Sequence, residues 1–153
     1  MAEPVLVRPY RPADWAAIEA VHDAARLDEL RLSVGTSAFR SLAATAEPEG
    51  LFNGQIWVAE LGGRVVGFAA TDEDEVGWLY VHPDAYRRGV GRALLRHAID
   101  QVGGRARTSV LDGNIPALAL YLSEGFVIVE TKDGHLQGLE AVPARGHLLE
   151  RAV

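Results

Sequence analysis

The chain of 153 residues is 48% hydrophobic and 24% charged, which is typical of one folded domain and argues against a disordered or fibrous chain. We therefore expect a single domain over residues 1–153. The net charge of −6 opposes non-specific nucleic-acid binding. No apolar run approaches the ~20 residues of a membrane-spanning helix. The lack of cysteine excludes disulfides and an acyl-cysteine intermediate.

In the N-terminal half, the first residues lack the charged and apolar pattern of a secretion signal, so we expect a cytoplasmic protein. Apolar residues at helical spacing and β-branched runs separated by glycine or proline predict the elements that follow. These are a strand at 5–8, helices at about 12–30 and 36–46, and a hairpin of strands at 55–60 and 64–70.

The C-terminal half predicts alternating strands and helices. Its expected elements are strands at 76–82, 106–111 and 126–131, helices at 89–103 and 114–124, a loop at 132–143 and a last strand at about 145–151. The order β-α-α-β-β-β-α-β-α-β-β predicts an α+β fold, with helices around one mixed sheet.

The segment from His82 to Leu95 lies where an expected strand leads into a helix. Gly89 and Gly91 would let a phosphate approach the unpaired N–H groups and the positive end of the helix dipole. Residues 87–96 contain four arginines and no acidic residue, a local charge of +4 from Arg87, Arg88, Arg92 and Arg96. The segment predicts a diphosphate-binding loop, while the arginines alone also fit a solvated helix face.

Two other phosphate-binding motifs fit this segment poorly. The mononucleotide P-loop needs Lys-Ser or Lys-Thr, and the chain contains neither pair. The dinucleotide motif needs a third glycine where this chain has Leu94, and it belongs to an all-parallel sheet. A nucleotide-binding protein is therefore the weakest of the alternatives considered.

A second motif runs from Asn114 to Phe126 and matches Asn-X-X-Ala-X-X-Leu-Tyr-X-X-X-Gly-Phe at every specified position. Together with the Arg88-Gly89-Val90-Gly91 loop, it resembles the GNAT superfamily of acetyl-CoA-dependent N-acetyltransferases. The order of elements agrees with that family from about residue 5 to 150. Tyr86 occupies the family's leading Arg/Gln position, so the side-chain contact there is in doubt and a neighbouring arginine could supply the charge.

The resemblance implies a GNAT-like, mostly antiparallel sheet of six or seven strands with about four helices, and acetyl-CoA as cosubstrate. Backbone amides from Arg88 to Ala93 would hold the diphosphate, and a strand edge at Leu79 and Val81 would pair with the pantetheine arm. The full set of expected contacts is Leu79, Tyr80, Val81, Arg87, Arg88, Gly89, Val90, Gly91, Arg92, Ala93, Asn114, Ala117 and Tyr121. From the residues alone, Asn114 also fits a helix N-cap and Tyr121 a core position.

The same resemblance implies two catalytic residues. Tyr121 would protonate the departing thiolate, because tyrosine is protonated at neutral pH. Glu75 would be the general base, although the acidic run 72–75 also fits a solvated turn, and Tyr80, His82 or a relayed water could serve instead. The Val81 N–H could stabilise the oxyanion. The histidines lack metal-ligand spacing, and we expect no metal.

The expected function is direct transfer of an acetyl group from acetyl-CoA to a primary amine within a ternary complex. The alternative is an acyl-CoA-binding or regulatory module without transfer activity. Acceptor contacts are expected from about 26–39 and 132–146, and the acidic charge favours a cationic amine such as a polyamine, an aminoglycoside-like compound or a protein N-terminus. Neither nucleic acid nor membrane is an expected partner, and a homodimer is compatible with the sequence.

Overall fold

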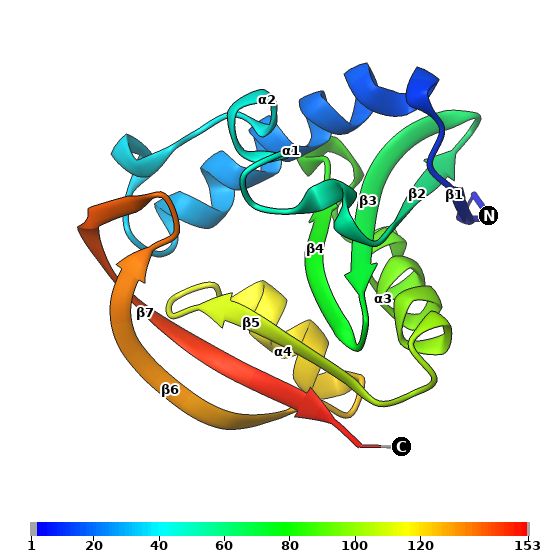
Figure 1. The fold of residues 1–153 in the computed structure, drawn as a ribbon. Coiled ribbons are helices and arrows are strands. Elements are labelled where there is room, and N and C mark those ends of the chain that lie inside the picture. Colours follow the sequence, from blue (N-terminus) through cyan, green and yellow to red (C-terminus); the bar gives the residue numbers. More distant parts are fainter. Residues whose placement is uncertain (1–2, 153) are drawn as a thin grey trace.

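A computed structural model describes residues 3–152 and contains a seven-stranded, mostly antiparallel sheet with four α-helices (Figure 1). The strand order is β1-β2-β3-β4-β5-β7-β6. The strands are β1 (Leu6–Pro9), β2 (Gln55–Leu61), β3 (Arg64–Asp72), β4 (Glu75–Val81), β5 (Ala106–Leu111), β6 (Val127–Leu136) and β7 (Leu139–Arg151). The α-helices are α1 (Trp15–Arg31), α2 (Leu42–Thr45), α3 (Val90–Gln101) and α4 (Ile115–Ser123). The expected α+β architecture is therefore confirmed.

The helices cover the two faces of the sheet because each contributes one apolar stripe. Ile18 and Val21 of α1 pack with Phe68 of β3 in one core cluster. On the opposite face, Leu94 of α3 packs with Ala69 of β3 in a second cluster. Further clusters join α3 and α4 to β5 and β7, and the end of α1 to the β6–β7 hairpin.

The sheet opens in its middle, between β4 and β5. These are its only parallel neighbours in the described residues, and a single register pair, Glu75 with Arg107, joins them. Beyond this pair the two strands diverge, as Figure 1 shows. Short bonds hold them at the closed end, where Arg107 N–H donates to Asp74 O (2.9 Å) and Thr108 Oγ1 to Val76 O (2.7 Å).

The expected helix at 36–46 is wrong in part. The segment contains a 3-10 turn, η2 (Thr36–Ala38), and the single turn α2, separated by extended backbone at Phe39. Ser41 starts α2 because its hydroxyl accepts a hydrogen bond from the Ala44 N–H (3.2 Å). A serine side chain accepts hydrogen bonds from backbone N–H groups, and it therefore favours the start of a helix over its interior.

The expected loop at 132–143 is also wrong. These residues continue β6 and begin β7, which form a hairpin around Gln137 and Gly138. Gly138 has a φ of +76°, which supplies the left-handed turn. The β6 side chains are exposed on both faces up to His135, so the period-2 hydrophobic signal of a half-buried strand is missing. None of the helices within residues 3–152 is long and apolar enough to cross a membrane.

Candidate active site

The loop before α3 has the backbone geometry of an anion-binding helix start. Arg87 and Gly89 both have positive φ, +63° and +79°, and Gly89 is the N-cap of α3. The Ala93 N–H donates to Gly89 O (3.0 Å), which leaves the N–H groups of the preceding first turn without intrahelical acceptors. Val90, which begins α3, is itself buried, at 1% exposure of the residue, and packs in the core cluster beneath the helix.

The four arginines of this segment divide into two pairs. Arg92 and Arg96 both bind the Glu124 carboxylate beyond α4, and Arg96 Nε lies 2.8 Å from Glu124 Oε1. Arg87 and Arg88 are exposed on the loop itself. The surplus of positive charge is therefore smaller than the sequence suggests, and it is concentrated on the loop.

The Tyr86 residue is 44% exposed and lies near Asp28 of α1. Partial burial, together with the Asp28 carboxylate, raises the pKa of this tyrosine to about 12. Its position explains how the loop accommodates an aromatic residue where the related family has Arg or Gln.

The open edge of β4 continues from this loop. The His82 N–H donates to Val66 O of β3 (2.8 Å). The backbone groups of Tyr80, two residues earlier, therefore face β3 as well. By the alternation of an antiparallel ladder, the backbone groups of Leu79 and Val81 point the other way, into the opening toward β5. This edge can accept an extended ligand as an added strand.

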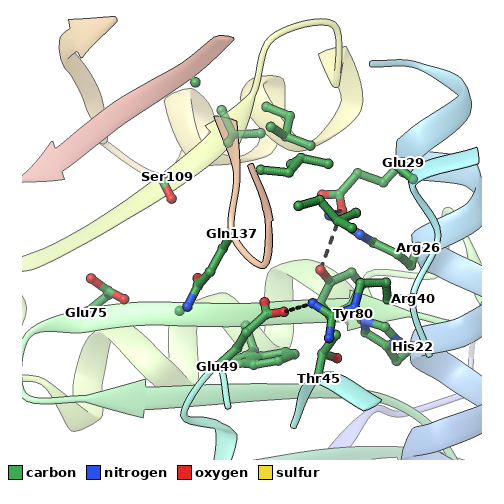
Figure 2. A pocket seen from close by; sticks show the side chains of 18 residues that line it. His22, Arg26, Glu29, Arg40, Thr45, Glu49, Glu75, Tyr80, Ser109 and Gln137 are labelled. Carbon is green, nitrogen blue, oxygen red and sulfur yellow. Dashed lines mark hydrogen bonds and ion pairs between the residues drawn. The ribbon is translucent and has the colours of Figure 1, made fainter. Parts of the chain in front are cut away.

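A β-bulge at Gly77 brings Glu75 and Tyr80 to the same face of the sheet. Val76 pairs with Thr71 and Trp78 with Ala70, so Gly77 has no partner of its own. Strict alternation would place residues 75 and 80 on opposite faces, and the extra residue restores them to one face. Both side chains line a cavity of about 320 Å³ on the α1 side of β4 (Figure 2).

Glu75 lies at the far end of this cavity, at the start of β4. Its carboxylate is 3.4 Å from Arg107 Nη1, and its side chain is 47% exposed. It can reach water as well as the cavity.

Asn114 and Tyr121, at the two ends of α4, are both buried. Asn114 caps the helix by accepting from the Ala117 N–H (3.4 Å), as the N-cap interpretation predicts. The Tyr121 ring packs edge to face on Phe126. Burial, with a smaller contribution from the Glu29 carboxylate, raises the pKa of Tyr121 to about 12.

Glu29 of α1 falls within the expected acceptor segment 26–39, but the sequence analysis did not single it out. Its carboxylate accepts from Asn114 Nδ2 (3.1 Å) and lies 3.5 Å from the Tyr80 hydroxyl, and it also binds Arg26. It therefore connects α1 to β4 and to the start of α4. Its sequence signal is a charged residue on the buried stripe that includes Ile18, His22 and Ala25.

The rest of the cavity wall comes from segments without recognisable motifs. Arg40 and Glu49 flank α2, and Gln137 points into the cavity from the β6–β7 turn (Figure 2). Arg40 and Glu49 form a loose ion pair with 3.7 Å between Nη1 and Oε2. Burial raises the pKa of Glu49. The expected acceptor segments, 26–39 and 132–146, thus both contribute to the cavity.

Comparison with known proteins places this arrangement in a family. The model of the acetyltransferase (GNAT) domain matches residues 52–128. A mycothiol acetyltransferase from Streptomyces bingchenggensis is 30% identical over 145 residues, which cover 86% of this chain and 46% of that protein. The peptidyl-lysine N-acetyltransferase YiaC of Escherichia coli is 36% identical over 81 residues, 52% of this chain and 55% of that protein. The chain spans about half the length of these relatives.

Solved structures show the same fold. A GCN5-related N-acetyltransferase from Rhodopseudomonas palustris aligns with a TM-score of 0.75 and 24% identity, over 100% of this chain and 99% of that one. The Salmonella typhimurium protein yncA, solved with its cofactor acetyl-CoA, aligns with a TM-score of 0.69 and 22% identity over 96% of this chain and 92% of that one. By its motifs, its fold and these relatives, the chain belongs to the GNAT acetyltransferase family.

Proposed function

We propose that the protein is an N-acetyltransferase that moves an acetyl group directly from acetyl-CoA to a primary amine in a ternary complex. The observation that carries the proposal is the continuity of three features: the open helix start at Gly89, the free edge of β4 and the charged cavity beside Tyr80. The first can hold a diphosphate, the second a pantetheine arm and the third an amine.

In this scheme, the acyl thioester lies near the junction of β4 and α4. The neutral amine attacks the thioester carbonyl carbon, so that a C–N bond forms and the C–S bond breaks. The Val81 N–H stabilises the oxyanion, and Tyr121 gives its proton to the departing thiolate. The products are an acetylated amine and CoA, and the scheme needs no metal ion.

A proton must also leave the amine. An alkyl amine with a pKa near 10.4 is about 3.4 units from neutrality at pH 7, a cost of about 4.6 kcal/mol, whereas an α-amine costs about 1 kcal/mol. Glu75 is our candidate base because it lines the cavity and contacts solvent, into which the proton can pass. A water relayed from the strand backbone is the competing base.

The acceptor is proposed by chemical class. Among the relatives, YiaC is a peptidyl-lysine N-acetyltransferase, and an Escherichia coli ribosomal protein bS18-alanine N-acetyltransferase is 40% identical over 72 residues, 42% of this chain and 49% of that protein. Both names describe amine acceptors. They support an amine of a small molecule or peptide as the acceptor of this protein. We further propose that the protein acts in the cytoplasm.

The variant Tyr121→Phe tests the mechanism. The phenylalanine ring keeps the packing on Phe126 and removes the hydroxyl. We expect kcat to fall about 100-fold or more, the usual contribution of a general acid, with little change in the Kd for acetyl-CoA. Release of CoA with an amine panel measures the first quantity, and calorimetric titration the second.

Tyr10→Phe, which alters a partly buried tyrosine packed against the core cluster of α1 and β3, is the control and should keep wild-type turnover. Unchanged kcat in Tyr121→Phe would remove the hydroxyl from the reaction. Tight CoA binding without CoA release from any amine would favour the acyl-CoA-binding module instead.

A further inference from the structure

The charged groups of the cavity differ in how well they are paired. Arg26 and Glu29 bind each other on α1, and Glu75 has Arg107 beside it. Arg40 and Glu49 form the loosest of these pairs, because the 3.7 Å between Nη1 and Oε2 is too long for a hydrogen bond. Glu75, 3.4 Å from Arg107, also lies beyond ordinary hydrogen-bond distance, and Arg107 donates to Asp74 instead. Figure 2 shows Arg40 and Glu49 on the cavity wall below Tyr80.

Arg40 is held in place by packing, although its guanidinium has no hydrogen-bond partner among residues 3–152. A Cβ at Gly138 would lie 2.2 Å from its Nη1, so the tip of the β6–β7 hairpin lies directly against the guanidinium. Within residues 3–152 its side chain makes no hydrogen bond; it is 31% exposed and lines the cavity. A guanidinium with free, fixed donors is suited to binding a carboxylate through two parallel hydrogen bonds.

Glu49 is the complementary half of the pair. Its side chain is 23% exposed, and it likewise accepts no hydrogen bond within the described part of the chain. Burial raises the pKa of this carboxyl, which means that the nearby Arg40 and Arg26 compensate its charged form only in part. A cationic amine brought close to Glu49 would complete that compensation.

These observations restrict the acceptor. A polyamine could pair with the carboxylates of the cavity, but it would leave Arg40 without an anionic partner and place positive charge beside it. A molecule that carries both an amine and a carboxylate would replace one loose ion pair with two close ones. An α-amino acid has both groups on one carbon, which suits two protein groups 3.7 Å apart, and it fits a cavity of about 320 Å³.

We propose that the acceptor is a small zwitterion of the amino-acid type, with its carboxylate bound by Arg40 and its amine directed toward Glu49. The inference rests on the proposed acetyltransferase function and specifies its substrate class. Arg40 is thereby a specificity-determining residue, located in a segment that carries no family motif.

Matched acceptors test the proposal. CoA release from acetyl-CoA is measured with L-amino acids, with their carboxamides and with the corresponding decarboxylated amines. For the wild type, we expect kcat/KM to be at least about 10-fold higher for the best amino acid than for its carboxamide, as for a charged hydrogen bond lost. In Arg40→Gln, kcat/KM for the amino acid should fall by at least this factor, while that for the carboxamide changes less than about threefold.

Three controls separate specificity from folding. Arg31→Gln alters an exposed arginine of α1 that pairs with Asp28 outside the cavity, and it should leave the preference unchanged. The Kd for acetyl-CoA should be the same in Arg40→Gln as in the wild type. Arg40→Lys keeps the positive charge but lacks the paired donors of the planar guanidinium. It should restore part of the preference for the amino acid over its carboxamide.

The outcomes are distinguishable. Equal kcat/KM for amino acids and carboxamides, or higher values for polyamines, would overturn the zwitterion while leaving the acetyltransferase function in place. No CoA release with any of these acceptors, nor with polyamines or peptides, would overturn the proposed function and this inference with it. A preference that survives in Arg40→Gln would exclude Arg40 as its source.

Discussion

Glu29 links three parts of the site through one carboxylate. It binds Arg26 on its own helix, accepts from Asn114 at the start of α4 and lies near the Tyr80 hydroxyl on β4. Such a group also affects its neighbours electrostatically, because its negative charge opposes ionisation of nearby phenols. Burial is the larger cause of the raised pKa of both Tyr80 and Tyr121, and Glu29 adds to it.

The tyrosines should therefore ionise at an unusually high pH. All four, Tyr10, Tyr80, Tyr86 and Tyr121, have a raised pKa, for which burial is the largest cause. We expect the native protein to show little phenolate absorbance at 295 nm at pH 10.5, where tyrosines of the urea-unfolded chain, with pKa values near 10, are mostly ionised.

The effect of these shifts on stability has a definite sign. Because the folded-state pKa lies above the unfolded one, their contribution is fully present below about pH 10 and is lost as the pH rises toward 12, the value for Tyr86 and Tyr121. Urea denaturation across this range measures the loss. A native titration centred near pH 10 would contradict the burial of these hydroxyls.

At the level of secondary structure, the end of α1 and the start of α4 meet at a glycine. Gly113 has a φ of +98°, and a Cβ there would lie 2.1 Å from the Leu32 carbonyl oxygen. Gly113 immediately precedes Asn114, so this close approach positions the N-cap that Glu29 contacts. Only a residue without a side chain allows both the conformation and the contact.

Gly113→Ala should be destabilising through two additive causes. Alanine at positive φ costs about 1–2 kcal/mol, and the clash with Leu32 adds to it because a backbone atom must move. Gly35→Ala is a matched control, since Gly35 has a φ of +96° and nothing within 4 Å of the added Cβ. Urea denaturation should show a larger loss for Gly113→Ala. Equal losses would mean that the α1–α4 contact relaxes freely.

On the scale of the entire fold, the sheet consists of two parts that share few bonds. β1 to β4 form one antiparallel part and β5 to β7 the other, and a single register pair at Glu75 and Arg107 joins them. A ligand that pairs with β4 inside the opening would add contacts between the two parts. Binding of this kind stabilises the folded state without any change in the protein's own packing.

Acetyl-CoA should accordingly raise the melting temperature. At about 100 times its Kd, a ligand adds about 2.7 kcal/mol, which for a chain of this size corresponds to about 5–10 °C. Scanning fluorimetry with acetyl-CoA and with ATP at equal concentrations measures the difference. A shift with ATP that exceeds the shift with acetyl-CoA would favour the nucleotide-binding alternative and contradict the CoA site.

The sequence predicted most elements because their signals are local. The glycines at 62 and 63 terminate two β-rich runs, Asn114 caps a helix, and the apolar stripe of α1 repeats at helical spacing. The proposed phosphate-binding loop is also a local pattern, because its chemistry lies in consecutive backbone groups. The β6–β7 hairpin could not be predicted this way, since exposed side chains on both faces of β6 carry no periodic signal.

The cavity, in contrast, required the tertiary structure. Its charged groups come from α1, from the segments around α2, from β4 and from the hairpin turn, and no spacing in the chain relates them. The bulge at Gly77 decides which side of the sheet Glu75 faces, and long-range packing sets the 3.7 Å between Arg40 and Glu49. The proposed cofactor contacts therefore follow from neighbouring residues, whereas the proposed acceptor contacts come from side chains that only folding brings together.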